Sequence, residues 1–192
     1  MSEPITVIGI TGVARSGKDT IAKLLCARHG FTRIALADGL RSAFGDLDGL
    51  TWDLRKELET FGISQRTMLQ IMGTECRMEI GFPRLWIALL LVKINYLAHH
   101  HPVPRTEFVV PDIRFLVEAS EFREMIPTRI GGSFDLWKVV RPGSGLDGIE
   151  GMHASETELD LIHPDVTIHN GNSIRELEAA VNTYARQLLE TR

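Results

Sequence analysis

Short apolar runs alternate with helical patterns along this chain. Five runs are apolar and mostly β-branched, which is typical of strands covered on both faces. They are Ile5–Ile10, Arg33–Ala37, Glu107–Val110, Leu136–Val140 and Val166–His169. Helical patterns follow the first run from Ile21, the third at Phe115–Ile126 and the fifth at Ile174–Glu190. Because strand–helix alternation with right-handed crossovers gives a parallel sheet between helices, the pattern predicts an α/β fold with a five-stranded parallel sheet.

A long helical insertion, residues 38–100, separates the second and third predicted strands. It contains the helical patterns Asp38–Leu47, Asp53–Thr60, Ser64–Glu79 and Arg84–Ala98. Its longest apolar run, Leu85–Val92, is far shorter than the roughly 20 residues that a membrane span needs. The chain has 192 residues and no internal repeat, so we expect one domain over residues 1–192 and no contact with membranes.

The run from Gly12 to Thr20 reads Gly-Val-Ala-Arg-Ser-Gly-Lys-Asp-Thr, which fits a P-loop between a strand and a helix. Gly12 and Gly17 let the backbone curl so that N–H groups point at phosphate oxygens, and Lys18 brings a positive charge to the β- and γ-phosphates. Asp19, followed by Thr20, stands where such loops usually have a hydroxyl that binds Mg²⁺. A carboxylate at this position is expected to be a Mg²⁺ ligand. The alternative for the whole run is an ordinary glycine turn before a helix whose first turn is acidic.

Polar or glycine-rich segments follow every predicted strand, at the edge where doubly wound parallel sheets bind ligands. They are residues 12–20, Asp38, Asp112 with Arg114, Arg141, and Asn170 with Gly171 and Asn172. Asp112 is interpreted as a Mg²⁺ ligand, with a cap of the following helix as the alternative. Residues 142–156 form either a surface loop or a mobile lid, because 142–154 have no periodic pattern.

The arginines favour a phosphorylated acceptor. A phosphate monoester is already largely anionic at neutral pH, so it needs no general base and instead needs cations that hold two phosphates together. The chain offers such cations at Arg15, Arg41, Arg66, Arg77, Arg114 and Arg141. The planar guanidinium suits bidentate contacts to phosphate, although any one of these arginines can also be a solvated surface residue.

Composition excludes several classes of protein. The net charge of −4 argues against binding to a nucleic-acid polymer, which normally requires a basic excess. The two cysteines, Cys26 and Cys76, are too few for a disulfide framework, and Cys26 is expected to be a buried thiol. The first residues, Met1–Pro4, lack the basic and apolar regions of a signal peptide. We therefore expect a protein of the reducing cytoplasm.

Taken together, these motifs resemble those of phage-type deoxynucleoside monophosphate kinases, and the matching pieces run almost from end to end. The P-loop with Arg15-Ser16 and the ending Lys18-Asp19-Thr20 is fairly specific, and the block from Arg66 to Arg77, with Leu69-Gln70 and Gly73-Thr74-Glu75, is more specific still. The further matches are Ala37-Asp38, Trp86, Asp112-x-Arg114-Phe115 with Glu118-Ala119, Arg141-Pro142-Gly143 and His153-x-Ser155-Glu156.

The resemblance implies a P-loop kinase fold and transfer of the γ-phosphoryl group of ATP, with Mg²⁺, to a deoxynucleoside monophosphate. By the same resemblance the insertion binds the acceptor through Arg66, Gln70, Glu75, Arg77 and Trp86, with Asp38 and Arg114 nearby. Trp86 can equally be helix core, given its apolar neighbours. Lys18, Arg15, Asp112 and Arg141 would be catalytic, Asn170 and Gly171 would lie near the donor adenine or form a simple turn, and a homodimer is possible by analogy.

Two other functions stay open on the residues alone. The chain could be a small-metabolite P-loop kinase of the dephospho-coenzyme A or phosphomevalonate type, in which Asp38 acts as a base toward a hydroxyl acceptor. It could also be a non-catalytic nucleotide-binding module, although no guanine-reading Asn-Lys-x-Asp element occurs in it.

Overall fold

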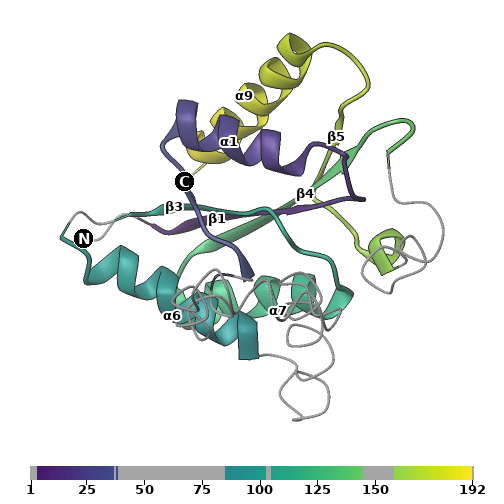
Figure 1. Ribbon diagram of the computed structural model, residues 1–192. Coiled ribbons are helices and arrows are strands. Elements are labelled where there is room, and N and C mark those ends of the chain that lie inside the picture. Colours follow the sequence, from purple (N-terminus) through teal and green to yellow (C-terminus); the bar gives the residue numbers. More distant parts are fainter. Residues whose placement is uncertain (1–3, 37, 39–84, 103–104, 145–157, 192) are drawn as a thin grey trace, which may run out of the picture.

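A computed structural model describes residues 4–36, 38, 85–102, 105–144 and 158–191 (Figure 1). In order, the described elements are β1 (Thr6–Thr11), α1 (Lys18–His29), β2 (Thr32–Arg33), α6 (Leu85–His99), β3 (Glu107–Val110), α7 (Leu116–Met125), a π-helical turn (Ile126–Ile130), β4 (Ser133–Val140), a 3₁₀ turn (Glu158–Leu161), β5 (Val166–His169) and α9 (Ile174–Glu190). The five described strands form one parallel sheet in the order β2-β3-β1-β4-β5. The predicted α/β fold is confirmed, with β1 at its centre.

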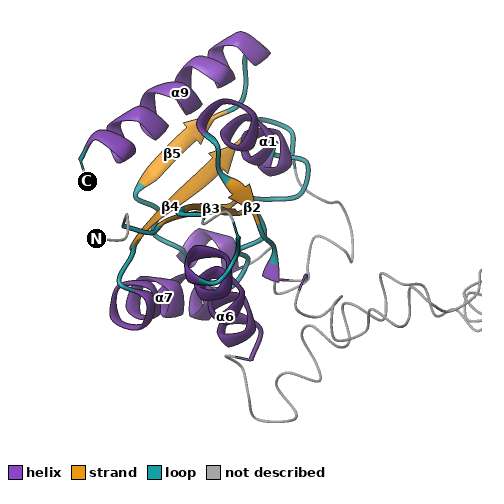
Figure 2. Ribbon diagram, turned by 90° about the vertical axis from the view of Figure 1, so that its left-hand side faces the viewer, coloured by secondary structure: helices purple, strands orange, loops and turns teal. Residues whose placement is uncertain are grey.

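Helices cover both faces of the sheet. In Figure 2, α1 and α9 lie on one face, and α6 and α7 lie on the other. The central strand β1 shows why the sequence requires this. Ile5 and Val7 are buried in the core beneath α6 and α7, while Ile8 and Ile10 are buried in the core beneath α1 and α9. Because successive side chains of a strand point to opposite faces, a strand without polar alternation needs a helical layer on each side.

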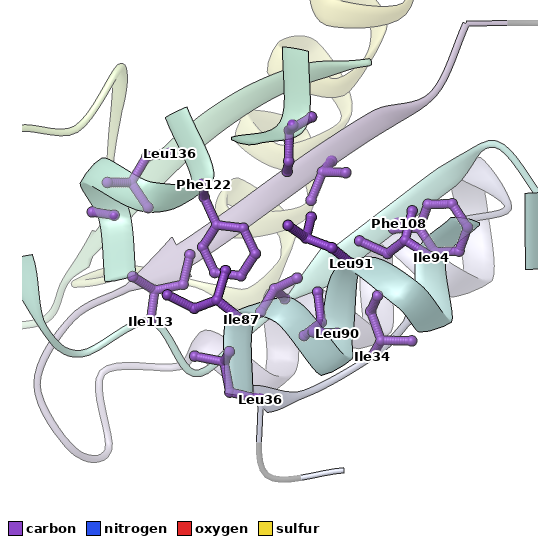
Figure 3. Packing of buried hydrophobic residues seen from close by; sticks show 14 of the residues in the cluster. Ile34, Leu36, Ile87, Leu90, Leu91, Ile94, Phe108, Ile113, Phe122 and Leu136 are labelled. Atoms are coloured by element: carbon purple, nitrogen blue, oxygen red, sulfur yellow. The ribbon is translucent and has the colours of Figure 1, made fainter. Parts of the chain in front are cut away.

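The core between the sheet, α6 and α7 is packed closely (Figure 3). Phe122 of α7 and Ile87 of α6 are fully buried, and the ring of Phe122 stacks on Phe134 with 5.5 Å between centroids. Burying a side chain of this size contributes about 1.5–3 kcal/mol. Gly9 of β1 lies under this layer, where a Cβ would collide with the side chains of Ile113 and Phe134. The central strand β1 is therefore packed tightly against the core layer beneath α6 and α7.

Most predicted elements lie close to their observed positions. α9, β3 and β5 have the predicted bounds, β1, α6 and α7 differ by one residue, and β4 begins three residues earlier, at Ser133. The Ser173 hydroxyl accepts a hydrogen bond from the Glu176 N–H at 3.3 Å and so caps α9, as its spacing predicts. α7 stops being α-helical at Met125 because Pro127 has no N–H to continue the ladder.

The prediction for the second strand is wrong in extent. The expected strand Arg33–Ala37 is replaced by β2 at Thr32–Arg33, although the Ile34 N–H still donates to the Val109 carbonyl at 3.0 Å. Beyond this point the chain turns, because the Asp38 N–H donates to the Ala35 carbonyl at 2.9 Å and the Asp38 carboxylate accepts from the Ala35 N–H at 2.9 Å. An aspartate that satisfies local backbone groups competes with the sheet for them.

Several predictions fall outside the described residues. These are the first three helical patterns of the insertion, apart from Asp38, and most of the possible lid.

Cys26 is half-buried rather than buried, and burial is the main cause that raises the pKa of its thiol. None of the helices that the structure describes is both long enough and apolar enough to cross a membrane.

Candidate active site

The loop between β1 and α1 has the backbone of a phosphate cradle. Gly12, Arg15 and Gly17 have φ angles of 143°, 64° and 110°, a backbone conformation that L side chains rarely adopt, before α1 begins at Lys18. A Cβ at Gly12 would lie 2.5 Å from the Val139 carbonyl oxygen, and one at Gly17 would collide with the side-chain amide of Asn170. Both glycines are therefore required by space as well as by backbone conformation.

The ammonium group of Lys18 lies across this loop. Its Nζ donates to the carbonyl oxygens of Gly12 at 2.6 Å and Val13 at 2.8 Å. The lysine thus stands at the N-terminus of α1, where the positive end of the helix dipole lies. Ammonium, helix N-terminus and curled backbone together form a site for an anionic phosphate group.

Two hydroxyls, one at the end of β1 and one in the loop, support this assignment. Thr11 and Ser16 are fully buried, and within the described residues neither hydroxyl oxygen has a hydrogen-bond partner. Buried polar atoms are nearly always paired in folded proteins, so such exceptions call for an explanation. Hydroxyls can donate to phosphate oxygens, so a bound phosphate chain fits the donors that the loop offers.

The carboxylate of Asp19 faces the end of β2. Its Oδ1 lies 3.4 Å from Nη2 of Arg33, and 76% of its side chain is exposed. An ion pair this exposed contributes little to stability, so it does not fix the carboxylate in place. The assignment of Asp19 to Mg²⁺ stays a prediction. Thr20 is half-buried in the same first turn of α1.

Two further carboxylates stand at the ends of β2 and β3. Asp112 Oδ1 accepts from the Leu36 N–H at 3.1 Å and so links the two strand ends. Asp38 Oδ2, which accepts from Ala35, also lies 3.4 Å from Nζ of Lys93 on α6. Their side chains therefore shape the turn after β2, whatever they bind in addition. The described residues hold no group of three or more His, Cys, Asp or Glu that could bind a metal on its own.

The predicted arginines of the described part come from different strand ends. Arg15 is at the tip of the loop, Arg114 precedes α7 and Arg141 follows β4, and all three are exposed. Trp86, in the first turn of α6, is partly buried and packs against the core, as one of its two interpretations expects. Arg66, Gln70, Glu75 and Arg77 lie outside the described residues.

Sequence reasoning missed three contacts that shape the site. The buried Glu118 accepts from the N–H groups of Arg114 and Phe115 at 2.9 and 3.1 Å, which fixes the start of α7. Lys93 reaches Asp38 from the insertion. Asn170, placed near the donor adenine on the sequence, donates from Nδ2 to the Ser16 carbonyl at 2.7 Å. None of these contacts has a local signal in the sequence, since Phe115 has no side-chain oxygen that would make its spacing from Glu118 a capping box.

Fold and loop together define a P-loop protein, with its phosphate cradle beside the central strand of a parallel sheet. No family model matches the chain. A protein of Acanthamoeba polyphaga mimivirus, provisionally named a deoxynucleotide monophosphate kinase, is 30% identical over 198 residues, covering 92% of this chain and 94% of the viral one. The chain belongs to the family of P-loop kinases that includes this viral protein.

Solved structures agree on the fold. TT1252 from Thermus thermophilus matches with a TM-score of 0.55 and 20% identity, covering 97% of this chain and 99% of the other. The dephospho-CoA kinase from Campylobacter jejuni matches with a TM-score of 0.54 and 13% identity, covering 96% and 98%. At these identities the likeness extends to the arrangement of helices and strands.

Proposed function

We propose that this kinase transfers the γ-phosphoryl group of ATP to a deoxynucleoside 5′-monophosphate, giving the diphosphate. The observation that carries the proposal is the relationship to the mimivirus protein over nearly the whole chain. The cradle around Lys18 supports the phosphoryl donor, since any P-loop kinase uses one, but by itself it does not select an acceptor.

The acceptor's own phosphate would be the nucleophile. Its oxygens are largely ionised at neutral pH, so the residues need to orient two anions and offset charge rather than remove a proton. Lys18 and the loop N–H groups would hold the donor's β- and γ-phosphates. Arg15 in the loop and Arg141 after β4, both exposed, would stabilise charge on the transferring group.

Mg²⁺ fits the oxygen donors at this edge of the sheet. Kinases commonly bind this ion through one or two carboxylates together with substrate phosphates, so a site without a full protein cage is adequate. Asp19 at the start of α1 and Asp112 at the end of β3 would hold it. When bound, Mg²⁺ neutralises charge on the β- and γ-phosphate oxygens.

We assign acceptor binding to the insertion and its neighbours. Arg66 and Arg77 would grip the acceptor phosphate, and Gln70 and Glu75 would contact the rest of the nucleotide. Within the described residues, Asp38, Trp86 and Arg114 would complete this side of the site.

Initial rates of ADP formation test the proposal. ATP and Mg²⁺ are supplied with each deoxynucleoside monophosphate in turn, including 5-methyl and 5-hydroxymethyl derivatives, and with ribonucleotides and dephospho-coenzyme A for comparison. We expect turnover with at least one deoxynucleotide, and its loss in Lys18→Ala with an unchanged circular dichroism spectrum. Turnover of dephospho-coenzyme A alone would instead favour a small-metabolite kinase.

A further inference from the structure

We propose that Asn170 is a positioning residue that holds the phosphate-binding loop in its binding conformation from the end of β5. This inference rests on the phosphate-binding role of the loop, and it is independent of which molecule accepts the phosphoryl group. It is an alternative to the expectation that Asn170 lies near the donor adenine.

The sheet fixes Asn170 on its backbone side. Its N–H donates to the Val140 carbonyl at 2.8 Å, which extends the pairing of β4 and β5 by one step beyond Val140 and His169. Its side chain then reaches the loop, where Nδ2 donates to the Ser16 carbonyl at 2.7 Å. A carbonyl oxygen can only accept, so the amide must present its nitrogen to Ser16.

Gly17 makes this approach possible. A Cβ at position 17 would collide with the Asn170 Nδ2, so the two residues form a matched pair. Gly17 has a φ of 110°, a conformation in which glycine meets little steric resistance. The same freedom leaves the peptide between Ser16 and Gly17 easy to rotate, and a hydrogen bond from a rigid strand end limits that rotation.

Because the peptide between Ser16 and Gly17 is planar, the hydrogen bond to the Ser16 carbonyl also sets the direction of the Gly17 N–H. In a trans peptide the C=O and the N–H point in opposite directions. With the Ser16 carbonyl held toward Asn170, the Gly17 N–H points away from β5. Gly17 directly precedes Lys18, and N–H groups at this point of a P-loop are donors to phosphate. Asn170 therefore orders a phosphate donor before any ligand arrives, which reduces the cost of ordering it on binding.

Binding of inorganic tripolyphosphate separates this role from contact with the adenine. Isothermal titration of Asn170→Ala should show tripolyphosphate and ATP each binding about tenfold more weakly than to wild type, the effect of one lost hydrogen bond of roughly 1.4 kcal/mol. Thr167→Ala, an exposed site on the same strand, serves as the control and should bind both ligands as wild type does.

The isosteric Asn170→Asp guards against an effect of lost volume. At pH 7 it presents an acceptor to the Ser16 carbonyl, so we expect a loss of affinity at least as large as in Asn170→Ala. Weaker ATP binding with unchanged tripolyphosphate binding would place Asn170 at the adenosine and overturn the inference, as would wild-type affinity for both ligands in both variants. If the deoxynucleotide assignment fails, these affinities still decide the role of Asn170.

Discussion

Arg15 occupies a backbone conformation that residues other than glycine rarely adopt. Its φ of 64° lies in the left-handed region, at the tip of the loop where a glycine would be comfortable. Strain of about 1 kcal/mol persists only where the surrounding structure imposes it, and residues strained in this way cluster at functional sites. The exposed guanidinium beside the cradle fits the stabilisation of charge on a transferring phosphoryl group.

Replacing Arg15 by glycine separates backbone strain from charge. For Arg15→Gly we expect a Tm equal to or slightly above that of wild type, because relief of strain offsets the greater freedom of the unfolded chain. The turnover number should fall by about 100-fold, since one charged donor to the reacting group is lost. Differential scanning calorimetry and steady-state rates measure both, and a turnover within twofold of wild type would exclude Arg15 from the chemistry.

Asp135 makes the stability of the fold depend on pH. Burial, the largest effect, raises the pKa of its carboxyl above the ordinary 3.8, and Asp165 adds to the rise, while the indole N–H of Trp137 and the charge of Arg123 oppose it. The folded chain thus holds this proton more tightly than the unfolded chain. That advantage is complete below pH 3.8 and is lost as the pH rises through the folded-state pKa.

Asp135→Asn should therefore stabilise the protein at pH 7, with a Tm higher by a few degrees at most, and the difference should vanish at low pH. The asparagine oxygen can still accept from Trp137 Nε1, which donates to Asp135 Oδ2 at 2.7 Å. Asp135→Ala is the matched control. It leaves a buried indole N–H without an acceptor and should destabilise by about 1–3 kcal/mol at neutral pH. A Tm difference that does not change with pH would contradict this account.

At the scale of the element, α6 packs against the sheet through one of its faces. Ile94 is fully buried in the core beneath the sheet, whereas Val92 is 68% exposed on the same helix. Ile94→Ala should cost about 2–5 kcal/mol of unfolding free energy, and Val92→Ala should change it by less than about 0.5 kcal/mol. Urea unfolding of the two variants measures this. Equal losses would mean that α6 packs through a different face.

Regular elements could be predicted because their signals are local. The cap at Ser173 and the periodic pattern after it define α9 on their own, and apolar runs locate β3 and β5. β2 could not be placed correctly, because Asp38 takes part in a turn whose backbone bonds compete with the sheet. The apolar pattern of residues 33–37 does not show whether a turn or the sheet takes up these backbone groups.

The candidate site divides in the same way. Spacing alone identified the loop from Gly12 to Lys18, because its chemistry lies in consecutive residues. The contact from Asn170 to Ser16 spans 154 positions and depends on the order of the strands, which places the end of β5 beside the loop only after folding. Lys93 and Asp38 likewise meet through the packing of α6 on the sheet.

At the scale of the whole molecule, ligand binding should stabilise the fold through the central strand. Tripolyphosphate at 100 times its dissociation constant should add about 2.7 kcal/mol, or about 5–10 °C in Tm for a chain of this size. Thermal unfolding followed by circular dichroism measures the shift. Lys18→Ala should abolish it, and a Tm that is insensitive to both ATP and tripolyphosphate would leave the loop without its assigned ligand.

The shortness of β2 limits how copies of this protein can associate. An outermost strand normally offers a row of N–H and C=O groups onto which a neighbouring polypeptide can add. Because β2 consists of Thr32 and Arg33 alone, it offers a neighbouring polypeptide very few backbone groups to pair with. Growth of the sheet from one molecule into the next is therefore disfavoured at the β2 side of the described sheet.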